Sequence, residues 1–517
     1  MWCAVVTLSW LSLPSRAYAQ GQAEHVVLMV WDGMRPDFIT PQYCPTLYAL
    51  ATNGTFFRRN HCVFVSTTQV NGAALATGSN PGRNGIQANV DFRPELNFLT
   101  TYASESLDAV RRGDLLTGGH YLTLPTLAET LQQAGIPTVI AGAKPVALFH
   151  DRSTKRDAEA AKKSVTLFEG KTIPRSLVES LAKVNDDKAF PGTITYPNLA
   201  QDNWTARALR HGLWKNGVPK YTLLWLSEPD KSQHEHGVGS SNALVAIENS
   251  DKNLADVIKT LKEKGVYEKT DIFIVSDHGF STITAGPDIE KILKQQKFNG
   301  GKKLEDPERG DVMVVGLGGS ASFYVIERDE PVIRRLVEFL QTADFTGVIF
   351  SRLPLEGTFP LEQVGYNSTK TTAPDVVISL RWNSNRNDYG APGMITSAGG
   401  TRGKGTHGSL SRYDMNNTLV AAGPSIKRGR ISDVPSGNID HAPTILHLLG
   451  VKPIQPMDGR VLHEALVRSK ETAPQVNVKK LEATRETGLF RWTQYLQFSE
   501  VNGTIYFDEG NGEPALK

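Results

Sequence analysis

Three aspartates and three histidines in this chain are the residue types that bind zinc when cysteine is scarce. The chain has 3 cysteines among 517 residues, which excludes a zinc site built from cysteine clusters and a fold held together by disulfides. Any bound metal must therefore be held by carboxylate and imidazole groups. The candidate ligands are Asp32, Asp230, His234, Asp277, His278 and His407.

The spacing of Asp230 and His234 strengthens this interpretation, because residues four apart on a helix or turn lie on the same side. An isolated pair of this kind is still a weak signal. Taken singly, Asp32 is equally well explained as a turn residue, and His278 as a core histidine. The argument for a metal centre therefore depends on where the elements of the fold place all six residues.

Short apolar runs alternate with amphipathic segments along the chain. Continuous runs suit strands buried on both faces, and segments with helical spacing lie between them. This alternation predicts an α/β fold with a mostly parallel central sheet and helices on both faces. The runs are 25–31, 137–141, 221–226, 271–275, 376–380 and 418–422, and the helical segments are 124–134, 204–213 and 243–262.

The candidate ligands come directly after these runs or in a glycine-rich loop. Asp32 follows the first run, Asp230 the third and Asp277 the fourth, while His407 lies in Gly-Thr-His-Gly. The carboxyl ends of parallel strands share one edge of a sheet, which is where such folds carry their chemistry. We therefore expect the six side chains to converge.

Both ends of the chain differ from its middle. Residues 1–19 are typical of a secretory signal peptide, with an apolar run too short to span a bilayer and then Ala17-Tyr18-Ala19; a buried strand is the alternative. The catalytic domain is expected at 20–470, with insertions near 285–315 and 345–372 that cover the sheet edge, and 471–517 as an aromatic-rich packed extension. Cys44 and Cys62 either pair or remain buried thiols.

The charge balance limits the classes of partner. Lys plus Arg number 56 and Asp plus Glu 54, so the formal net charge is +2 and no strong field favours a nucleic-acid polymer. No second apolar stretch has membrane length. We expect an exported, periplasmic or secreted protein without a membrane span, acting on a small molecule. The oligomeric state is not predicted.

As a set, these residues and their neighbours resemble the alkaline phosphatase superfamily, and within it the nucleotide pyrophosphatase/phosphodiesterase branch, which is related to phosphonoacetate hydrolase. The resemblance follows the family's order over residues 25–465. It implies an alkaline-phosphatase-like α/β fold with inserted cap segments. The matching segments are 32–37, 66–71, 76–78, 228–234, 276–279, 405–408, 440–444, 449–450 and 458–460.

The resemblance also implies two Zn²⁺ ions and a threonine nucleophile. One ion is expected on Asp230, His234 and His407, and the other on Asp32, Asp277, His278 and the oxygen of Thr68. His236 and His441 match no ligand position and are interpreted as structural.

Thr68 is preferred to Thr67 as the nucleophile because its spacing to Asn71 matches the family. A threonine hydroxyl is a poor nucleophile unless a base or a metal lowers its pKa, and the ligand-rich site offers the metal. Asn71 is expected to donate a hydrogen bond to a phosphoryl oxygen. The alternative is that both threonines cap the helix that follows, a role compatible with nucleophilic attack.

Two departures from the motifs of related enzymes narrow the range of expected substrates. Ser66 to Val70 lacks the pattern from which sulfatases form their formylglycine, so sulfatase chemistry is disfavoured. Lys144 resembles a substrate-binding lysine of phosphonoacetate hydrolases, but Val146 stands where that branch has a second lysine. Lys144 is therefore either a substrate-binding residue or a solvated lysine at a strand end.

The expected function is an exported two-zinc phosphodiesterase or nucleotide pyrophosphatase that forms a covalent phospho-threonine. Diesters are favoured over monoesters because Asn71 is neutral and Lys144 is the one extra cation predicted near the nucleophile. A phosphomonoesterase or phosphonate hydrolase with the same site is the first alternative. A secreted binding protein without catalysis is the second.

Overall fold

The computed structural model describes residues 23–469 and 474–517, so the predicted signal peptide at 1–19 lies outside the described residues. Within these ranges the largest sheet has nine strands. Its centre, β10-β1-β9-β6-β7, is parallel, while β22 and β8 run antiparallel to their inner neighbours. In sheet order the strands are β23 (Arg430–Ser432), β2 (Thr55–Phe57), β22 (Leu419–Ala422), β10 (Thr270–Val275), β1 (His25–Trp31), β9 (Tyr221–Leu226), β6 (Thr138–Gly142), β7 (Val165–Phe168) and β8 (Lys171–Ile173).

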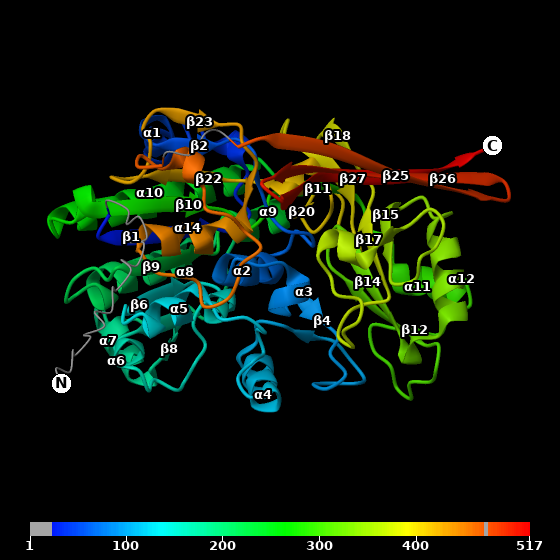
Figure 1. Ribbon diagram of the computed structural model, residues 1–517, viewed down its shortest axis with the longest axis horizontal. Coiled ribbons are helices and arrows are strands. Elements are labelled where there is room, and N and C mark those ends of the chain that lie inside the picture. Colours follow the sequence, from blue (N-terminus) through cyan, green and yellow to red (C-terminus); the bar gives the residue numbers. More distant parts are fainter. Residues whose placement is uncertain (1–22, 470–473) are drawn as a thin grey trace, which may run out of the picture.

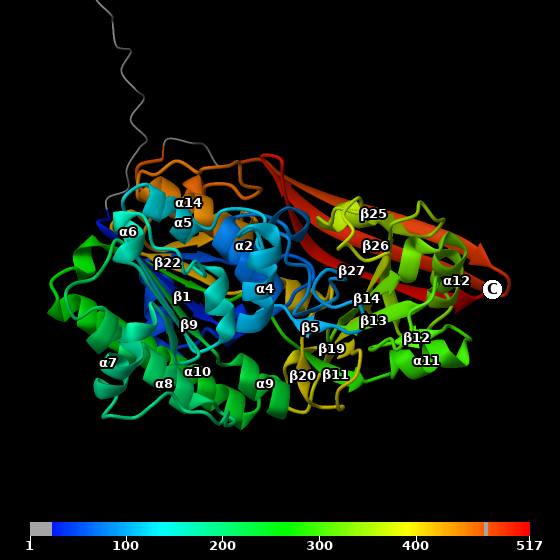
Figure 2. The same cartoon turned by 90° about the horizontal axis from the view of Figure 1, so that it is seen from below.

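Helices cover both faces of this sheet (Figure 2), as the alternating pattern predicts. On one face lie α2 (Thr68–Thr77), α5 (Leu127–Gln133) and α14 (His441–Leu448); on the other lie α1 (Pro45–Asn53), α8 (Leu199–Arg207) and α10 (Ser241–Glu263).

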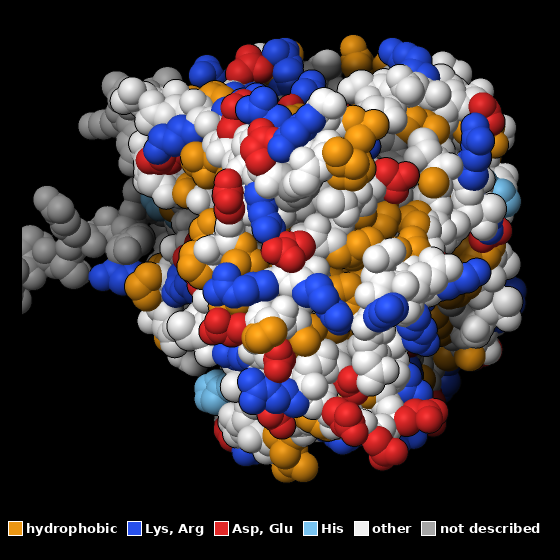
Figure 3. Space-filling view, turned by 90° about the vertical axis from the view of Figure 1, so that its right-hand side faces the viewer, with side chains coloured by type: hydrophobic (Ala, Val, Ile, Leu, Met, Phe, Trp, Pro, Cys, Tyr) orange, Lys and Arg blue, Asp and Glu red, His pale blue; other side chains and the backbone are white. Residues whose placement is uncertain are grey.

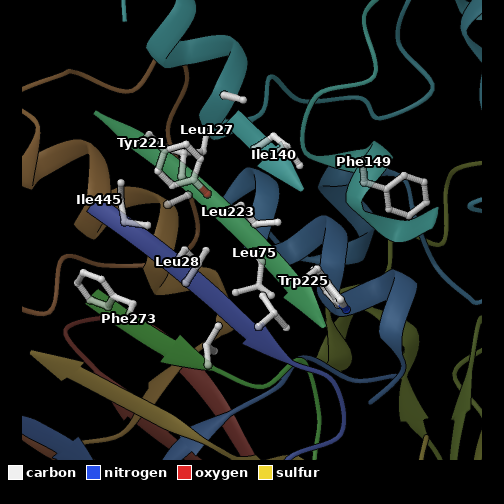
Figure 4. Close-up of a cluster of buried hydrophobic side chains, with 14 of the residues drawn as sticks. Leu28, Leu75, Leu127, Ile140, Phe149, Tyr221, Leu223, Trp225, Phe273 and Ile445 are labelled. Carbon is white, nitrogen blue, oxygen red and sulfur yellow. The ribbon is translucent and has the colours of Figure 1, made fainter. Parts of the chain in front are cut away.

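The strand β1 shows how one sequence run serves two cores. Successive side chains of a strand point to opposite faces. Leu28 therefore joins the core under α2 and α14, together with Leu75 and Ile445 (Figure 4), while Met29 joins the core on the opposite face. Burial on both sides fixes the register of β1, and with it the position of the loop that begins at Asp32.

A second unit, rich in antiparallel strands, follows β10 (Figure 1). Its six-stranded sheet packs α11 (Ile289–Gln295) and α12 (Glu330–Leu340) on one face. The strands are β12 (Gly300–Gly301), β13 (Val312–Gly316), β14 (Ser320–Val325), β17 (Val376–Leu380), β15 (Thr346–Ser351) and β16 (Phe359–Pro360). A four-stranded sheet joins it to the site: β18 (Trp382–Arg386), β19 (Pro392–Thr396), β11 (Ser281–Ala285) and β20 (Gly405–Thr406).

Two of the predicted strands differ from the expected parallel arrangement. The run 376–380 forms β17 of the second sheet, and 418–422 contains β22, which is antiparallel to β10. The physical reason is that a continuous apolar run indicates a strand buried on both faces, but does not indicate which sheet the strand joins or in which direction it runs. The predicted insertions 285–315 and 345–372 both lie within the second unit.

The C-terminal residues form a long three-stranded antiparallel sheet that lies along both units (Figure 1). Its strands are β25 (Val476–Thr487), β26 (Phe490–Val501) and β27 (Thr504–Leu516). Leu496, Phe498 and Phe507 enter the core shared with the second sheet.

Three further observations bear on the sequence expectations. On the face shown in Figure 3, basic and acidic side chains are interspersed, in keeping with the balanced charge. Among the described residues, no helix combines the length and the hydropathy needed to cross a bilayer. Cys44 and Cys62 are both buried and free.

Candidate active site

The carboxyl ends of β1, β9 and β10 bring three of the predicted aspartates together. β1 pairs with both other strands in parallel, so the loops that follow lie side by side. The Asp230 N–H donates to the carbonyl of Asp32 at 2.9 Å, and the Gly33 N–H donates to Oδ1 of Asp277 at 3.0 Å. The three loops are thus hydrogen-bonded to one another at the sheet edge.

Asp230, His234 and His407 form one group of ligand atoms within 4.8 Å of each other. Asp230 and His234 lie one turn apart on α9 (Asp230–His236), as their spacing predicts, and His407 follows β20. Nε2 of His234 is 3.2 Å from Oδ1 of Asp230, and Nε2 of His407 is 3.6 Å from the same oxygen.

The second predicted group lies beside the first. Nε2 of His278 is 3.2 Å from Oδ2 of Asp277, 3.7 Å from Oδ1 of Asp32 and 3.1 Å from the hydroxyl of Thr68. Ligand atoms of Asp32, Asp230 and His278 also lie within 4.8 Å of one another, so Asp230 borders both groups.

Each of the three histidines is oriented by its other ring nitrogen. Nδ1 of His234 donates to the carbonyl of Gly405 at 3.1 Å, Nδ1 of His278 to that of Gly279 at 2.9 Å, and Nδ1 of His407 to that of Ser66 at 2.8 Å. A carbonyl accepts only, so these contacts place the proton on Nδ1 and leave the Nε2 lone pair directed into the site. Metal-binding histidines are held in this way.

Each of the three carboxylates likewise leaves one oxygen available to a metal. Oδ1 of Asp230 and Oδ2 of Asp277 are buried and have no hydrogen-bond partner among the described residues. Oδ2 of Asp32 accepts from Nε1 of Trp225 at 2.7 Å, which leaves Oδ1 facing His278. Buried carboxylate oxygens without a donor require a cation, so this donor set fits divalent metal.

Burial and mutual repulsion perturb the titration of these groups. Burial and the charge of Asp277 raise the pKa of Asp32, against the opposing charge of Lys144. Burial lowers the pKa of His278 and, together with the two other histidines, that of His407 well below its usual range. These two imidazoles are therefore held neutral, which is the form that binds metal.

The two threonines have different surroundings. Thr68 is the first residue of α2, and its hydroxyl lies 3.1 Å from Nε2 of His278 and 3.5 Å from Oδ1 of Asp32. Thr67 occupies the N-cap position but makes no side-chain cap bond, and its buried hydroxyl has no partner in the described chain. Helix capping therefore does not account for either hydroxyl.

Lys144 follows β6 and is buried, with 8% of its surface exposed, which excludes a solvated lysine. Its Nζ is 2.9 Å from Oδ2 of Asp32, 3.1 Å from Oδ2 of Asp230 and 3.5 Å from the Thr68 hydroxyl. Burial alone would lower the pKa of Lys144, but the charges of Asp230, Asp32 and Asp277 raise it well above its usual value. Lys144 is thus a fixed cation that joins one ligand of each group.

The contacts of Asn71 do not fit the predicted contact with a phosphoryl oxygen. Its Nδ2 donates to the carbonyls of Thr67 at 3.1 Å and Val63 at 3.2 Å, and its Oδ1 accepts from the Val63 N–H at 2.8 Å and from Asn438 at 3.0 Å. The cause is helix geometry: a side chain in the first turn leans toward the N-terminus, onto residues three and four positions earlier.

Asn89 is a residue that the sequence reasoning missed. Its Oδ1 accepts from the N–H of Gln69, next to Thr68, at 3.0 Å, and the side chain is partly exposed. The amide Nδ2 has no hydrogen bond to the described residues, and the contact of Oδ1 with Gln69 holds the side chain next to the residue that follows Thr68. The signal available in the sequence was weak: a single asparagine after Gly85 and Ile86.

A family model provides the comparison that identifies the chain. The model for type I phosphodiesterase / nucleotide pyrophosphatase matches residues 26–409, a range that contains every predicted ligand. The chain belongs to this family. This confirms the resemblance read from the motifs.

Relatives agree with the family assignment. The chain is 23% identical over 266 residues to a venom phosphodiesterase of Crotalus durissus collilineatus. The aligned region covers 50% of this chain and 26% of that protein. It is 20% identical over 450 residues to mouse bis(5'-adenosyl)-triphosphatase enpp4, covering 86% of this chain and 81% of the relative. The chain thus spans about a quarter of the venom phosphodiesterases that it matches.

The solved structure of murine ectonucleotide pyrophosphatase/phosphodiesterase 5 shows the same fold. It matches with a TM-score of 0.58 and 17% identity, covering 86% of this chain and all of the other. The alkaline-phosphatase-like α/β fold expected for this phosphodiesterase family is therefore confirmed.

Proposed function

We propose that this chain is an exported phosphodiesterase or nucleotide pyrophosphatase that binds two Zn²⁺ ions and forms a covalent phospho-threonine at Thr68. The observation that carries the proposal is the convergence of three imidazoles and three carboxylates at one sheet edge, with the Thr68 hydroxyl 3.1 Å from Nε2 of His278. Export is supported by the N-terminal pattern and by relatives described as venom enzymes and ectonucleotide enzymes.

Six side chains and the threonine oxygen would hold the metals in the two sets that the family resemblance implies. Asp230, His234 and His407 would hold one ion, and Asp32, Asp277, His278 and Thr68 the other. Zinc held there would favour the ionised form of the Thr68 hydroxyl at neutral pH and would offset negative charge on the phosphoryl and leaving oxygens.

The chain's own residues then act in a fixed order. The Thr68 oxygen, having lost its proton to solvent, forms a bond to phosphorus as the bond to the leaving oxygen breaks. The leaving oxygen keeps that electron pair and takes a proton from water. A water molecule then forms a bond to phosphorus as the bond from the Thr68 oxygen to phosphorus breaks. The water gives a proton to solvent, the Thr68 oxygen keeps the electron pair and takes up a proton, and the phosphomonoester departs.

Two neighbouring side chains complete the proposed site. Lys144 is placed to hold Asp32 and Asp230 and to balance charge beside the nucleophile. Asn89 takes the role that was predicted for Asn71, with its Nδ2 donating to a phosphoryl oxygen as charge develops there. Lys144 is held by two carboxylates and brings no free positive charge, which favours diesters over monoester dianions.

The test is turnover of bis(4-nitrophenyl) phosphate and 4-nitrophenyl phosphate by zinc-loaded protein, with zinc measured by elemental analysis. We expect about two zinc ions per chain and a higher kcat/KM for the diester. A tenfold monoester advantage would favour the phosphatase alternative. No turnover of either ester by protein with both ions bound would favour the non-catalytic binding protein.

A further inference from the structure

Four buried asparagines hydrogen-bond one another beside the loops that carry the proposed site. They are Asn60, Asn71, Asn417 and Asn438, each with 0% of its surface exposed. A buried amide is tolerated when its donors and acceptors have partners, and a fully satisfied network gives one rigid arrangement. None of the four is a proposed metal ligand or nucleophile, so the network needs another explanation.

Asn438 holds the peptide group that joins two of the proposed zinc ligands. It lies in the 3₁₀ turn Asn438–Asp440, directly before α14. Its Nδ2 donates to the carbonyl of Asp277 at 2.6 Å. That carbonyl belongs to the planar peptide between Asp277 and His278, so one hydrogen bond fixes the backbone from which both ligand side chains project.

The same amide reaches the nucleophile through Asn71. Nδ2 of Asn438 also donates to Oδ1 of Asn71 at 3.0 Å. Nδ2 of Asn71 in turn donates to the carbonyl of Thr67 at 3.1 Å, in the peptide that precedes Thr68. Two side chains in series therefore connect the backbone of the Asp277 loop to the backbone of the nucleophile.

The remaining contacts of Asn438 keep its side chain from turning. Its Oδ1 accepts from Nδ2 of Asn417 at 3.1 Å, and Asn417 also donates to the carbonyl of Ser276. Rotation of the Asn438 amide would break three hydrogen bonds in a buried environment, where an unpaired polar group is costly. The side chain therefore holds a fixed spacing between the two loops.

This spacing matters because no short stretch of chain sets it. The Thr68 hydroxyl lies 3.1 Å from Nε2 of His278, although the two residues are 210 positions apart in the sequence. Their side chains meet because non-covalent contacts hold the loop after β10 against the start of α2. An error of about 1 Å between reacting groups can lower a rate about 10²-fold.

We propose that Asn438 is a positioning residue, which acts through Asn71 to set the distance between the Thr68 oxygen and the ligand pair Asp277 and His278. Its effect falls on the rate of phosphoryl transfer and on the zinc ion that this ligand pair holds, rather than on substrate binding. The inference rests on the proposed two-zinc phosphodiesterase and adds a residue that orients its site.

The kinetic test uses Asn438→Ala, which removes both donated hydrogen bonds, with bis(4-nitrophenyl) phosphate and the full chain at saturating zinc. We expect kcat to fall about 10- to 100-fold while KM stays within about threefold of wild type. A loss of stability alone would leave kcat unchanged at a temperature well below the unfolding transition. Wild-type kcat in the folded variant would overturn the inference.

Asn60→Ala is the matched control, because Asn60 is an equally buried asparagine whose amide bonds two other side chains instead of the two peptides. Its Nδ2 donates to Oδ1 of Asn417 at 2.5 Å, and its Oδ1 accepts from the hydroxyl of Ser436 at 2.9 Å. Both variants should lower the urea midpoint of unfolding, but Asn60→Ala should keep kcat within about threefold of wild type. An equal loss of kcat in both variants would show that the network only stabilises the fold, and would overturn the inference.

Zinc affinity provides a readout that needs no turnover. Competition with a chromogenic chelator measures the binding of zinc to wild type, Asn438→Ala and Asn60→Ala. We expect one ion to bind about tenfold or more weakly in Asn438→Ala, and both ions to bind as in wild type in Asn60→Ala. Unchanged affinity for both ions in Asn438→Ala would overturn the inference. A wild type that binds two zinc ions without hydrolysing the diester would instead contradict the proposed function, and the zinc comparison would still decide whether Asn438 holds the ligand pair.

Asn438→Ser replaces the alanine variant if that variant does not fold. The shorter side chain leaves space for a water molecule between the polar groups of Asp277, Asn71 and Asn417, which lessens the loss of stability. We expect the same direction of change, with kcat lowered about fivefold or more and KM unchanged. Wild-type kcat together with wild-type zinc affinity in this variant would overturn the inference.

Discussion

At the scale of single residues, the two adjacent threonines offer the sharpest test of the proposed chemistry. Thr68→Ala should remove nearly all diester turnover, because its oxygen lies 3.1 Å from His278 and no other described hydroxyl occupies that place. Thr67→Ala should have a mild effect, since the Thr67 hydroxyl has no partner to lose.

The measurement is kcat/KM with zinc content determined on the same samples. Both variants keep all six Asp and His ligands and should retain close to two zinc ions. A severe loss in Thr67→Ala together with an active Thr68→Ala would move the nucleophile by one residue.

Lys144 gives a second prediction at this scale. Lys144→Met keeps the length of the side chain but removes the charge that joins Asp32 to Asp230. We expect kcat/KM for the diester to fall about 10- to 100-fold at saturating zinc, as is typical when a group that orients metal ligands is lost. Wild-type activity in this variant would show that the lysine is not needed for the arrangement of the carboxylates.

At the scale of elements, the start of α2 separates a positioning asparagine from one that meets substrate. Asn71→Ala removes the side-chain bonds that tie α2 to the preceding loop, so it should lower the free energy of unfolding by about 1–3 kcal/mol. Asn89→Ala should leave stability nearly unchanged but reduce kcat about 10²- to 10³-fold. Urea unfolding and kinetics on both variants test this, and reversed effects would restore Asn71 as the phosphoryl donor.

The elements also show what the sequence could and could not predict. The strands that carry Asp32, Asp230 and Asp277 were predictable, because a parallel sheet buried on both faces demands continuous apolar runs that end where the polar loops begin. The sheet to which the run 376–380 belongs could not be predicted, because burial alone does not indicate which strands it pairs with.

Side-chain direction was a further limit of the sequence. The type and spacing of Asn71 matched a substrate contact, yet its place in the first turn of α2 directs it onto the backbone. Asn89 lies in a loop, where no helical or strand repeat determines which way a side chain points. Its hydrogen bond with the backbone N–H of Gln69 could not be predicted from residue types.

At the scale of the whole molecule, the C-terminal sheet joins the two units. Gln494 of β26 bonds the backbone of Ile349 in the second unit, at 2.7 Å from its N–H and 3.2 Å from its carbonyl. Tyr506 of β27 donates to Asp440, which leads into α14 of the catalytic unit, at 2.8 Å. The aromatic residues that marked this extension in the sequence thus pack between units rather than around a site.

Asp508 of β27 is the charged part of this attachment and gives the last prediction. Its carboxylate lies 3.1 Å from Nε2 of His61 and 3.0 Å from Arg59, both of the catalytic unit. Burial would raise the pKa of Asp508, but the hydrogen bond and charge of His61, with Ser499 and Arg59, lower it to about 2. Because the folded pKa lies below the ordinary value of about 3.9, the ionised group stabilises the fold above pH 4, and this contribution is lost as the pH falls through about 2. We therefore expect Asp508→Asn to be less stable than wild type by on the order of 2 kcal/mol at pH 6, with the difference disappearing near pH 2.

Asp433→Asn is the control, since it breaks the exposed ion pair with Arg58, which contributes little to stability. Urea unfolding of the three metal-free proteins across this pH range measures the differences, and a gap between wild type and Asp508→Asn that stays constant with pH would show that Asp508 acts through packing alone.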